Sequence, residues 1–496
     1  MATEETRPLL AEDVEQSPER PKKETPLPLR QLSIVYLIQF CEPLTGLVIY
    51  PFIAELVQET GITGGDPKAI GYYAGIVESL FFFSEFLTCM QWGRLSDYHG
   101  RRPILLIAPL GLALATYGFG FAKSFWLLCV FRFLQGVFNG NVGVSKSVMA
   151  EVTDSTNRAR AFSIMPLNWS VATTLAPFIG GTLSNPAKHF PDVFGGVRLF
   201  EEYPYLLPCV FSATGSLLVF IFAYFYLIET LPSAVKKGKN SRLSSSASST
   251  TTLEEERTAE GYGTISDEAR ASEAEVAPPP SANALLRDPY VAKVLLAYVV
   301  FVFGDMSLSA LVPIILYAPI KNGGLGFTPL EIGTIMGVWG IYNIVFQLVV
   351  SPYLIKRFGP RPMQMAAVTA TALMATFLPL ENFVARRAGH VNGLALALLA
   401  LQYFCLSFTY IGYGTIHMYI IDSAPTHNSM GAVNGLAQAM ATLGRTSAPW
   451  LSTSLLSLSL EKDILGGRLV FLLIISMACI AFLATTRLPK HLRNAH

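Results

Sequence analysis

The chain has 496 residues and a formal net charge of +1, with 51% of its residues hydrophobic and 14% charged. Soluble globular proteins carry about 25% charged residues, so this composition excludes a typical soluble domain and indicates a polytopic membrane protein. The sequence contains no basic patch interleaved with aromatic residues, which argues against nucleic-acid binding.

The chain begins with a polar, acidic stretch that we expect to be a disordered tail over residues 1–31. It lacks the apolar core of a cleavable signal peptide. Glu5-Thr6-Arg7-Pro8-Leu9-Leu10 fits the acidic-dileucine pattern of vacuolar and endosomal sorting, although so short a match also arises by chance. The plasma membrane and the vacuolar membrane therefore both remain open as locations.

Twelve apolar runs follow, and each is near the 20 residues that a membrane-spanning helix needs. They cover 32–57, 70–92, 103–122, 125–149, 160–183, 205–227, 291–316, 330–353, 362–380, 392–420, 430–456 and 467–487. The runs 160–183 and 430–456 are the least apolar, because they carry many polar and small residues. The pattern predicts an all-α integral membrane protein of twelve transmembrane helices.

A polar segment at 229–289 divides the twelve runs into six and six. It is rich in Ser, Thr, Glu and Ala, a composition that cannot bury a core, so we expect a disordered linker in which the serines at 241–249 are open to phosphorylation. The predicted organisation is a tail at 1–31, six-helix bundles at 32–228 and 290–488 around the linker, and a second tail at 489–496.

Basic residues set the expected orientation. The short loops on the side of the termini contain Arg94, Arg101, Arg102, Arg158, Arg160, Lys356, Arg357 and Arg361. The same side also holds Lys236, Lys237, Lys239, Arg487, Lys490 and Arg493, whereas the loops on the other side keep mainly Lys68, Lys123, Lys188, Arg198, Lys321, Arg386, Arg387, Lys462 and Arg468. The bias favours a cytoplasmic position for both termini and for the linker.

An internal repeat indicates that the halves are related. The stretch Trp92 to Pro103 is a charged segment, expected to be a loop, and a weaker copy runs from Ser351 to Pro362. Without gaps, Leu95, Gly100, Arg102 and Pro103 align with Leu354, Gly359, Arg361 and Pro362. Ala176-Pro177 and Ala448-Pro449 also take the same place in their halves. Two repeated six-helix bundles are typical of one class of transporters.

These motifs resemble those of the major facilitator superfamily. Gly93-Arg94-Leu95-Ser96-Asp97-Tyr98-His99-Gly100-Arg101-Arg102 is similar to its signature between helices 2 and 3, with Tyr98 where a basic residue is common. Arg132-Phe133-Leu134-Gln135-Gly136 resembles its helix 4 motif. Ala176-Pro177-Phe178-Ile179-Gly180-Gly181 resembles the end of the helix 5 motif of proton-driven exporters, with Ala176 in place of glycine.

Within the superfamily, the chain resembles the branch of fungal drug:proton antiporters and zinc-induced-facilitator-like proteins. Plant members carry Cys-Pro-Gly-Cys in helix 1, whereas Cys41-Glu42-Pro43-Leu44 stands here, so export of a zinc chelate does not follow. The six cysteines lie in apolar runs without a Cys-x-x-Cys pair, and we expect neither disulfides nor a metal site. We also expect no cofactor.

The resemblance implies a gate made by Gly93, Asp97, Gly100, Arg101, Arg102 and Glu151. Asp97 is placed to accept from backbone N–H groups at a nearby helix start, where an anion is stabilised by about 0.3–1 kcal/mol. Arg101 can pair with Glu151 or Asp154. An ordinary positively charged loop is the alternative, but such a loop needs neither Asp97 nor the glycines.

Ionisable residues inside the spans are candidates for coupling, because each costs at least about 2.5–3.5 kcal/mol at mid-helix. Glu42 and Arg132 are the favoured proton-coupling pair, with Asp305 and Glu78 as further sites. Static ion pairs that hold helices together are the alternative.

The family's central cavity is lined by the first, fourth, seventh and tenth helices. The matching candidates here are Gln39, Tyr50, Gln135, Asn139, Tyr403, Ser407 and Tyr410. The tyrosines suit an amphipathic or aromatic substrate, whereas helix packing explains the same residues equally well. In helix 5, Pro177, Gly180 and Gly181 permit a bend and close contacts.

The favoured function is proton-coupled antiport of a small organic molecule or chelate out of the cytosol by a monomer. A uniporter, a proton symporter for a nutrient and a transport-inactive sensor are the alternatives. The sequence holds neither a nucleophile–base constellation nor Gly-x-x-x-x-Gly-Lys-[Ser/Thr], so an enzyme and an ATP-driven pump are not expected.

Overall fold

The computed structural model describes residues 25–154, 156–231, 282–425 and 429–490, and all regular structure within these ranges is helical. Residues 1–24 of the tail predicted over 1–31, the sorting pattern, the serine cluster and most of the linker lie outside the described residues. Thr25, the first described residue, lies close to the loop between the helices that end at Val152 and begin at Arg158.

Each of the twelve apolar runs coincides with a helix or a pair of consecutive helices. In chain order these are α1 (Leu29–Leu47) with α2 (Ile53–Glu59), α3 (Ile70–His99), α4 (Arg101–Gly120), α5 (Phe125–Asn139) with α6 (Val142–Val152), α7 (Arg158–Leu183), α11 (Leu206–Tyr226), α15 (Pro289–Tyr317), α16 (Pro329–Val345) with α17 (Ser351–Phe358), α18 (Pro360–Ala388), α19 (Gly393–Asp422), α20 (Met430–Glu461) and α21 (Leu469–Thr486). The predicted all-α membrane fold is confirmed.

Nine helical segments in the described ranges are long and apolar enough to cross a membrane by themselves. The runs that fall short are those of α1, α7 and α20. α7 and α20 contain the two runs that the sequence marks as least apolar, and both pack along helices of the opposite half, α16 and α3 respectively. Their polar and small residues therefore face protein rather than lipid, which removes the need for a continuous apolar surface.

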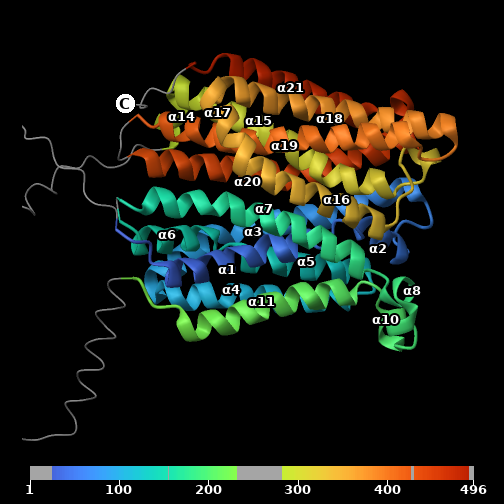
Figure 1. The fold of residues 1–496 in the computed structure, drawn as a ribbon, viewed down its shortest axis with the longest axis horizontal. Coiled ribbons are helices and arrows are strands. Elements are labelled where there is room, and N and C mark those ends of the chain that lie inside the picture. The colour runs from blue at the N-terminus through green and yellow to red at the C-terminus, as the bar shows by residue number, and fades with distance from the viewer. Residues whose placement is uncertain (1–24, 155, 232–281, 426–428, 491–496) are drawn as a thin grey trace, which may run out of the picture.

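The helices form two bundles that lie side by side (Figure 1). α1 to α11, coloured blue to green, make the first half, and α14 (Ala282–Arg287) to α21, coloured yellow to red, make the second. We call the end of the molecule that holds Thr25, α14 and the end of α21 the near end, and the opposite end the far end. Three short helices cap the first half at the far end: α8 (Pro186–His189), α9 (Pro191–Phe194) and α10 (Arg198–Glu202).

The two halves touch most closely towards the far end. A Cβ atom at Gly75 of α3 would lie 1.9 Å from the Thr453 hydroxyl of α20, and one at Gly181 of α7 would lie 2.6 Å from the Cα of Gly333 in α16. The hydroxyl of Ser79 accepts from the backbone N–H of Trp450 at 3.0 Å. Glycine is needed here because two helix backbones approach each other without room for a side chain.

The repeated charged segment is not the loop that its composition predicts. α3 continues to His99 and α4 begins at Arg101, so Gly100 alone, at φ +106°, joins the two helices. The copy has the same form, because Gly359 at φ +84° joins α17 to α18. One residue with positive φ is enough to reverse the chain, and the charged residues before it keep their helical conformation.

Candidate functional site

A cluster of four charged side chains lies between the halves. Glu42 of α1, Glu85 of α3 and Lys146 of α6 come from the first half, and Arg445 of α20 comes from the second. Glu42 and Glu85 each interact electrostatically with Arg445 and Lys146, and also with one another. All four are only half-buried. We call these residues the central cluster; two carboxylates there face two cations, one of them across the boundary between the halves.

Asn139 of α5 lies beside both carboxylates of the central cluster. Its side chain is 1% exposed, and its amide is a hydrogen-bonding group for both Glu42 and Glu85, although neither contact has ideal hydrogen-bond geometry. Asn139 therefore links the two carboxylates of the central cluster to α5.

Arg132, the expected partner of Glu42, occupies a different position. Its guanidinium donates to the Gln135 amide oxygen at 2.8 Å and to the Gly46 carbonyl at 3.0 Å, and it lies 4.6 Å from the centre of the Phe81 ring. Gln135 in turn donates to the Thr116 hydroxyl at 3.1 Å. Gly46 follows Glu42 by one helical turn, so Arg132 lies further towards the far end than the central cluster.

Glu78 is the carboxylate that acts on Arg132. The Tyr50 hydroxyl donates to Glu78 at 2.5 Å, and all three side chains are buried. Glu42 and Arg132 are thus not brought together, and the structure gives them separate partners. This second group, Tyr50–Glu78–Arg132, belongs entirely to the first half.

Asp305 of α15 is the buried carboxylate of the second half. It accepts a hydrogen bond from the Tyr413 hydroxyl at 2.6 Å and interacts electrostatically with Arg445. Arg445 therefore lies between Asp305 on its own side and the carboxylates Glu42 and Glu85 on the other. A single cation that carboxylates of both halves can attract is well placed to change partners.

The proposed cavity residues of α19 surround Trp339 of α16. The indole N–H donates to the Ser407 hydroxyl at 3.2 Å, and the rings of Tyr403 and Tyr410 lie 5.7 and 5.6 Å from the Trp339 ring. Ser407 is fully buried and Tyr403 is 6% exposed, whereas Tyr410 is half-buried. In this conformation the group mostly packs α16 against α19.

Gln39 of α1 lies half-buried near the central cluster. Its amide nitrogen contacts the Met149 sulfur at 3.9 Å. In α7, Pro177 is buried, and a Cβ atom at Gly180 would lie 1.9 Å from the Val48 carbonyl oxygen. Gly180 thus packs within the first half and Gly181 against the second, so the two glycines of this motif serve different contacts.

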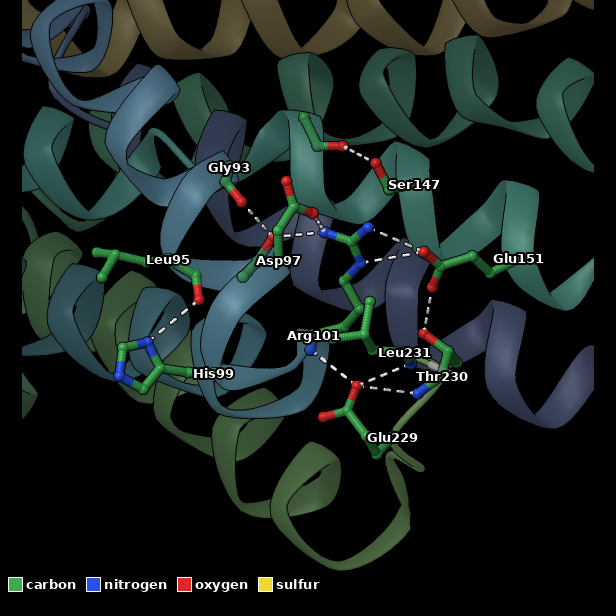
Figure 2. A network of polar contacts seen from close by, with 12 residues as sticks. Gly93, Leu95, Asp97, His99, Arg101, Ser147, Glu151, Glu229, Thr230 and Leu231 are labelled. Carbon is green, nitrogen blue, oxygen red and sulfur yellow. Dashed lines mark hydrogen bonds and ion pairs between the residues drawn. The ribbon is translucent and has the colours of Figure 1, made fainter. Parts of the chain in front are cut away.

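The gate residues form a network at the near end (Figure 2). Arg101 donates to Asp97 at 2.5 Å and to Glu151 at 3.0 Å, so Glu151 rather than Asp154 is its second partner. Two-thirds of the Asp97 side chain is exposed, and Arg101 is its partner in place of a helix start. All of these contacts lie within the first half.

Glu229 has the role that the sequence suggested for Asp97. Its carboxylate accepts from the backbone N–H groups of Arg101 and Arg102, at 2.8 and 3.0 Å, and so caps the start of α4. The next residue, Thr230, donates to Glu151 at 2.5 Å (Figure 2). Sequence reasoning missed Glu229 because it opens the polar segment at 229–289; its position directly after the sixth apolar run was the available signal.

The remaining gate residues are Gly93, Gly100 and Arg102, and the two glycines differ in how much space surrounds them. A Cβ atom at Gly100 would lie 2.5 Å from Glu229, whereas one at Gly93 would meet nothing within 4 Å. The Arg102 guanidinium donates to the Tyr224 carbonyl at 2.7 Å. The gate therefore needs glycine at position 100, whereas a larger side chain has room at position 93.

Asp154 connects a different pair of segments. Its carboxylate accepts from the hydroxyls of Thr25 and Thr156, and these bonds hold the pKa of Asp154 at about 2, below its ordinary value of 3.8. The folded carboxylate thus stays charged, and its contribution to stability is lost only as pH falls from about 3.8 through about 2. Asp154 ties the segment before α1 to the loop between α6 and α7.

Comparison with known proteins shows which family the sequence matches. The family model for the Major Facilitator Superfamily matches residues 35–449. The chain is 30% identical to the major facilitator-type transporter psiT2 of Psilocybe cyanescens, over 92% of this chain and 89% of that protein. It is 28% identical to the multidrug transporter mfsB of Aspergillus fumigatus, over 88% and 79% of the two chains.

Identity is also 28% to the protein ZINC INDUCED FACILITATOR 1 of Arabidopsis thaliana, over 85% of this chain and 83% of that one. Among solved structures, a D-xylose-proton symporter aligns with a TM-score of 0.67 at 14% identity, over 93% of this chain and 98% of that one. At this identity the match supports the fold alone. The relatives thus include a fungal multidrug transporter and a plant zinc-induced facilitator.

Proposed function

Because the chain belongs to the Major Facilitator Superfamily, we propose that it exports a small organic molecule from the cytoplasm in exchange for protons. Its family and fold are those of membrane transporters, and its homologues include multidrug and efflux proteins. Proton coupling, the outward direction and the cytoplasmic position of the near end belong to the proposal.

The central cluster is the observation that carries the proposal. Glu42 and Glu85 of the first half face Arg445 of the second. When the halves separate around this point, the two carboxylates keep Lys146 of their own half but lose Arg445, so two half-buried negative charges then share one cation, which is costly. Binding a proton removes that cost. Proton binding at Glu42 or Glu85 would thus accompany one conformation, and the ion pair with Arg445 the other.

The contacts that close the far end also support exchange between two conformations. With the near end in the cytoplasm, contacts of α3 with α20 and of α7 with α16 shut the protein towards the outside. The gate residues, in contrast, form their contacts within one half. In this proposal the structure represents a state in which a cytoplasmic substrate can reach the central cluster.

The residues around the central cluster indicate an amphipathic substrate. The Asn139 amide lies beside the carboxylates, Glu42 and Arg445 offer opposite charges, and Tyr410 and Tyr413 add aromatic surface. A small molecule with an aromatic body and a polar or charged group fits such a set. A relative is called a multidrug transporter, which agrees with a substrate of this kind.

Proteoliposomes with an imposed pH gradient test the proposal. We expect accumulation of a suitable aromatic amine or acid against its gradient, driven by protons moving the other way. In Glu42→Gln, proton-driven flux should fall to background while substrate exchange without a gradient continues, because the amide cannot exchange a proton. Glu201→Gln, an exposed position at the far end, is the matched control.

Three results would contradict this assignment. Substrate flux that does not change with the pH gradient would indicate a uniporter. Substrate flux in the same direction as proton movement would indicate a symporter. Loss of both driven flux and exchange in a folded Glu42→Gln protein would assign Glu42 to substrate binding or structure instead of coupling.

A further inference from the structure

Glu381 is a buried carboxyl group that lies away from the central cluster. It belongs to α18, in the half of the helix nearer the far end, and its side chain is fully buried by protein. Neither carboxylate oxygen has a hydrogen-bond partner. Sequence reasoning ended the ninth span at residue 380 and so left Glu381 outside it, whereas α18 continues to Ala388.

The facing helix, α19, brings two further unpaired polar groups to this region. Gln402 is fully buried, and neither its amide oxygen nor its amide nitrogen has a partner. The hydroxyl of Tyr403 is also buried without a partner, and Tyr403 interacts electrostatically with Glu381. Three buried side chains of α18 and α19 thus have unused hydrogen-bonding capacity, and Glu381 and Gln402 each leave both of their polar atoms unpaired. This points to an occupant, because buried polar groups usually have partners.

The contacts between α18 and α19 place Glu381 and Gln402 at a similar height along the two helices. Thr415 donates to Gln364 at 2.7 Å, and a Cβ atom at Gly412 would meet Ala367 at 2.6 Å. Because α18 and α19 run antiparallel through these contacts, Glu381 lies level with Leu398. Gln402 is one helical turn further along α19.

The surroundings of Glu381 are apolar. Leu378 and Ala385, one turn away on either side along α18, are buried in the main hydrophobic core together with Leu399 and Tyr403. No charged group in the described part of the chain acts appreciably on Glu381.

The elements packed against α18 account for this lack of counter-charge. They are α15, α17, α19, α21 and the 3-10 turn Ile320–Asn322, and besides Tyr403 their ionisable groups include Asp305, Lys321, Lys356, Arg357 and Cys479. Asp305 is bonded to Tyr413, and Lys356 and Arg357 lie at the near end. Lys321 and Arg386 belong to segments beside Glu381, since Asn382 donates to the Ile320 carbonyl, but both side chains are exposed and neither acts on Glu381. A bare carboxylate here would be an uncompensated buried charge.

We propose that α18 and α19 enclose a proton-binding site in which Glu381 holds the proton and the unpaired groups of Gln402 and Tyr403 become its hydrogen-bonding partners when these side chains reorient. A proton fits better than a metal ion, because the described residues contain no cluster of three or more His, Cys, Asp or Glu side chains. The site is separate from the central cluster and does not depend on the coupling role of Glu42.

Infrared difference spectroscopy of the purified full-length protein tests for this proton directly. The wild type should show the C=O band of a buried carboxylic acid that persists at neutral pH and shifts in D2O. Glu381→Gln should lose this band, and Glu201→Gln, an exposed carboxylate, should keep it. Gln402→Leu keeps the acid but removes a partner, so the band should shift in frequency without being lost.

Thermal unfolding over a range of pH provides the second measurement. As pH rises and the proton leaves, the unfolding temperature of the wild type should fall, while that of Glu381→Gln should fall less, since an amide stays neutral. The series is repeated with sodium chloride and with choline chloride at equal ionic strength to detect a competing cation.

An unchanged band in Glu381→Gln would overturn the proposal. So would stabilisation by sodium that is specific to proteins with Glu381, because the site would then take a metal cation. If Glu381→Gln does not fold, the Gln402→Leu band decides: an unshifted band means that the acid seen is elsewhere. Neither measurement involves transport, so failure here is distinct from failure of the proposed function.

Discussion

Glycines in the gate show how strongly the role of one residue depends on its backbone and neighbours. Gly93 and Gly100 both belong to the motif, but only Gly100 has a positive φ and a neighbour that excludes a Cβ atom. Gly93 lies inside α3 with open space around it. The same residue type in one motif thus has two different requirements.

Gly100→Ala should destabilise the protein by about 1–3 kcal/mol, because alanine is strained at this φ and its Cβ displaces Glu229 from the start of α4. Gly93→Ala is the matched control. It should be neutral or stabilise by about 0.5–1 kcal/mol, since alanine favours a helix interior. Thermal unfolding of both variants compares them, and equal effects would contradict the role assigned to Gly100.

At the scale of elements, the pairs α3–α20 and α7–α16 close the far end through residues without bulky side chains. Gly75 packs on Thr453, and Gly181 packs on Gly333. Such contacts hold by shape and involve few polar bonds, so they can form and break as two rigid bundles rock.

Gly75→Val should keep the far end from closing, because even a Cβ atom would come within 1.9 Å of the Thr453 hydroxyl. A cysteine at Ser457, which is 1% exposed, reports the change through its reaction with an impermeant thiol reagent. Labelling should increase several-fold in Gly75→Val and stay low in Gly93→Val on the same helix. Equal labelling in the two would show that this contact does not control closure.

At the scale of the whole molecule, transport requires the halves to separate at the far end once in each cycle. Tyr72 of α3 and Glu461 of α20 meet there, with the hydroxyl 3.3 Å from the carboxylate oxygen. Their contact joins the two bundles across the closed end. A covalent link at this point therefore tests whether opening is necessary.

Cysteines at Tyr72 and Glu461, joined by a flexible bifunctional thiol reagent, should abolish transport. The exposed native cysteines Cys89 and Cys479 are first replaced by serine. Each single-cysteine protein, and the double variant treated with a monofunctional reagent, should continue to transport. Full activity of the bridged protein would mean that the far end need not open.

Hydropathy predicted the architecture because a bilayer imposes its thickness on every span. The repeat around Gly100 and Gly359 predicted the two halves, and one of two proposed partners of Arg101 proved to be Glu151. Polar composition misled at the end of α18, because Glu381 was assigned to a connecting segment although it lies inside that helix. Glu229 does follow the last helix of its half, but composition gave no sign that it caps α4.

The sequence by itself determined the membrane fold, its twofold repeat and the residue types at the gate, since these depend on local composition and spacing. Only the tertiary structure decided which charges meet. Glu42 faces Arg445 instead of Arg132, and Glu229 instead of Asp97 caps α4. Such pairings depend on the depth and rotation of each helix against its neighbours, which packing of the whole bundle sets and no single stretch of sequence encodes.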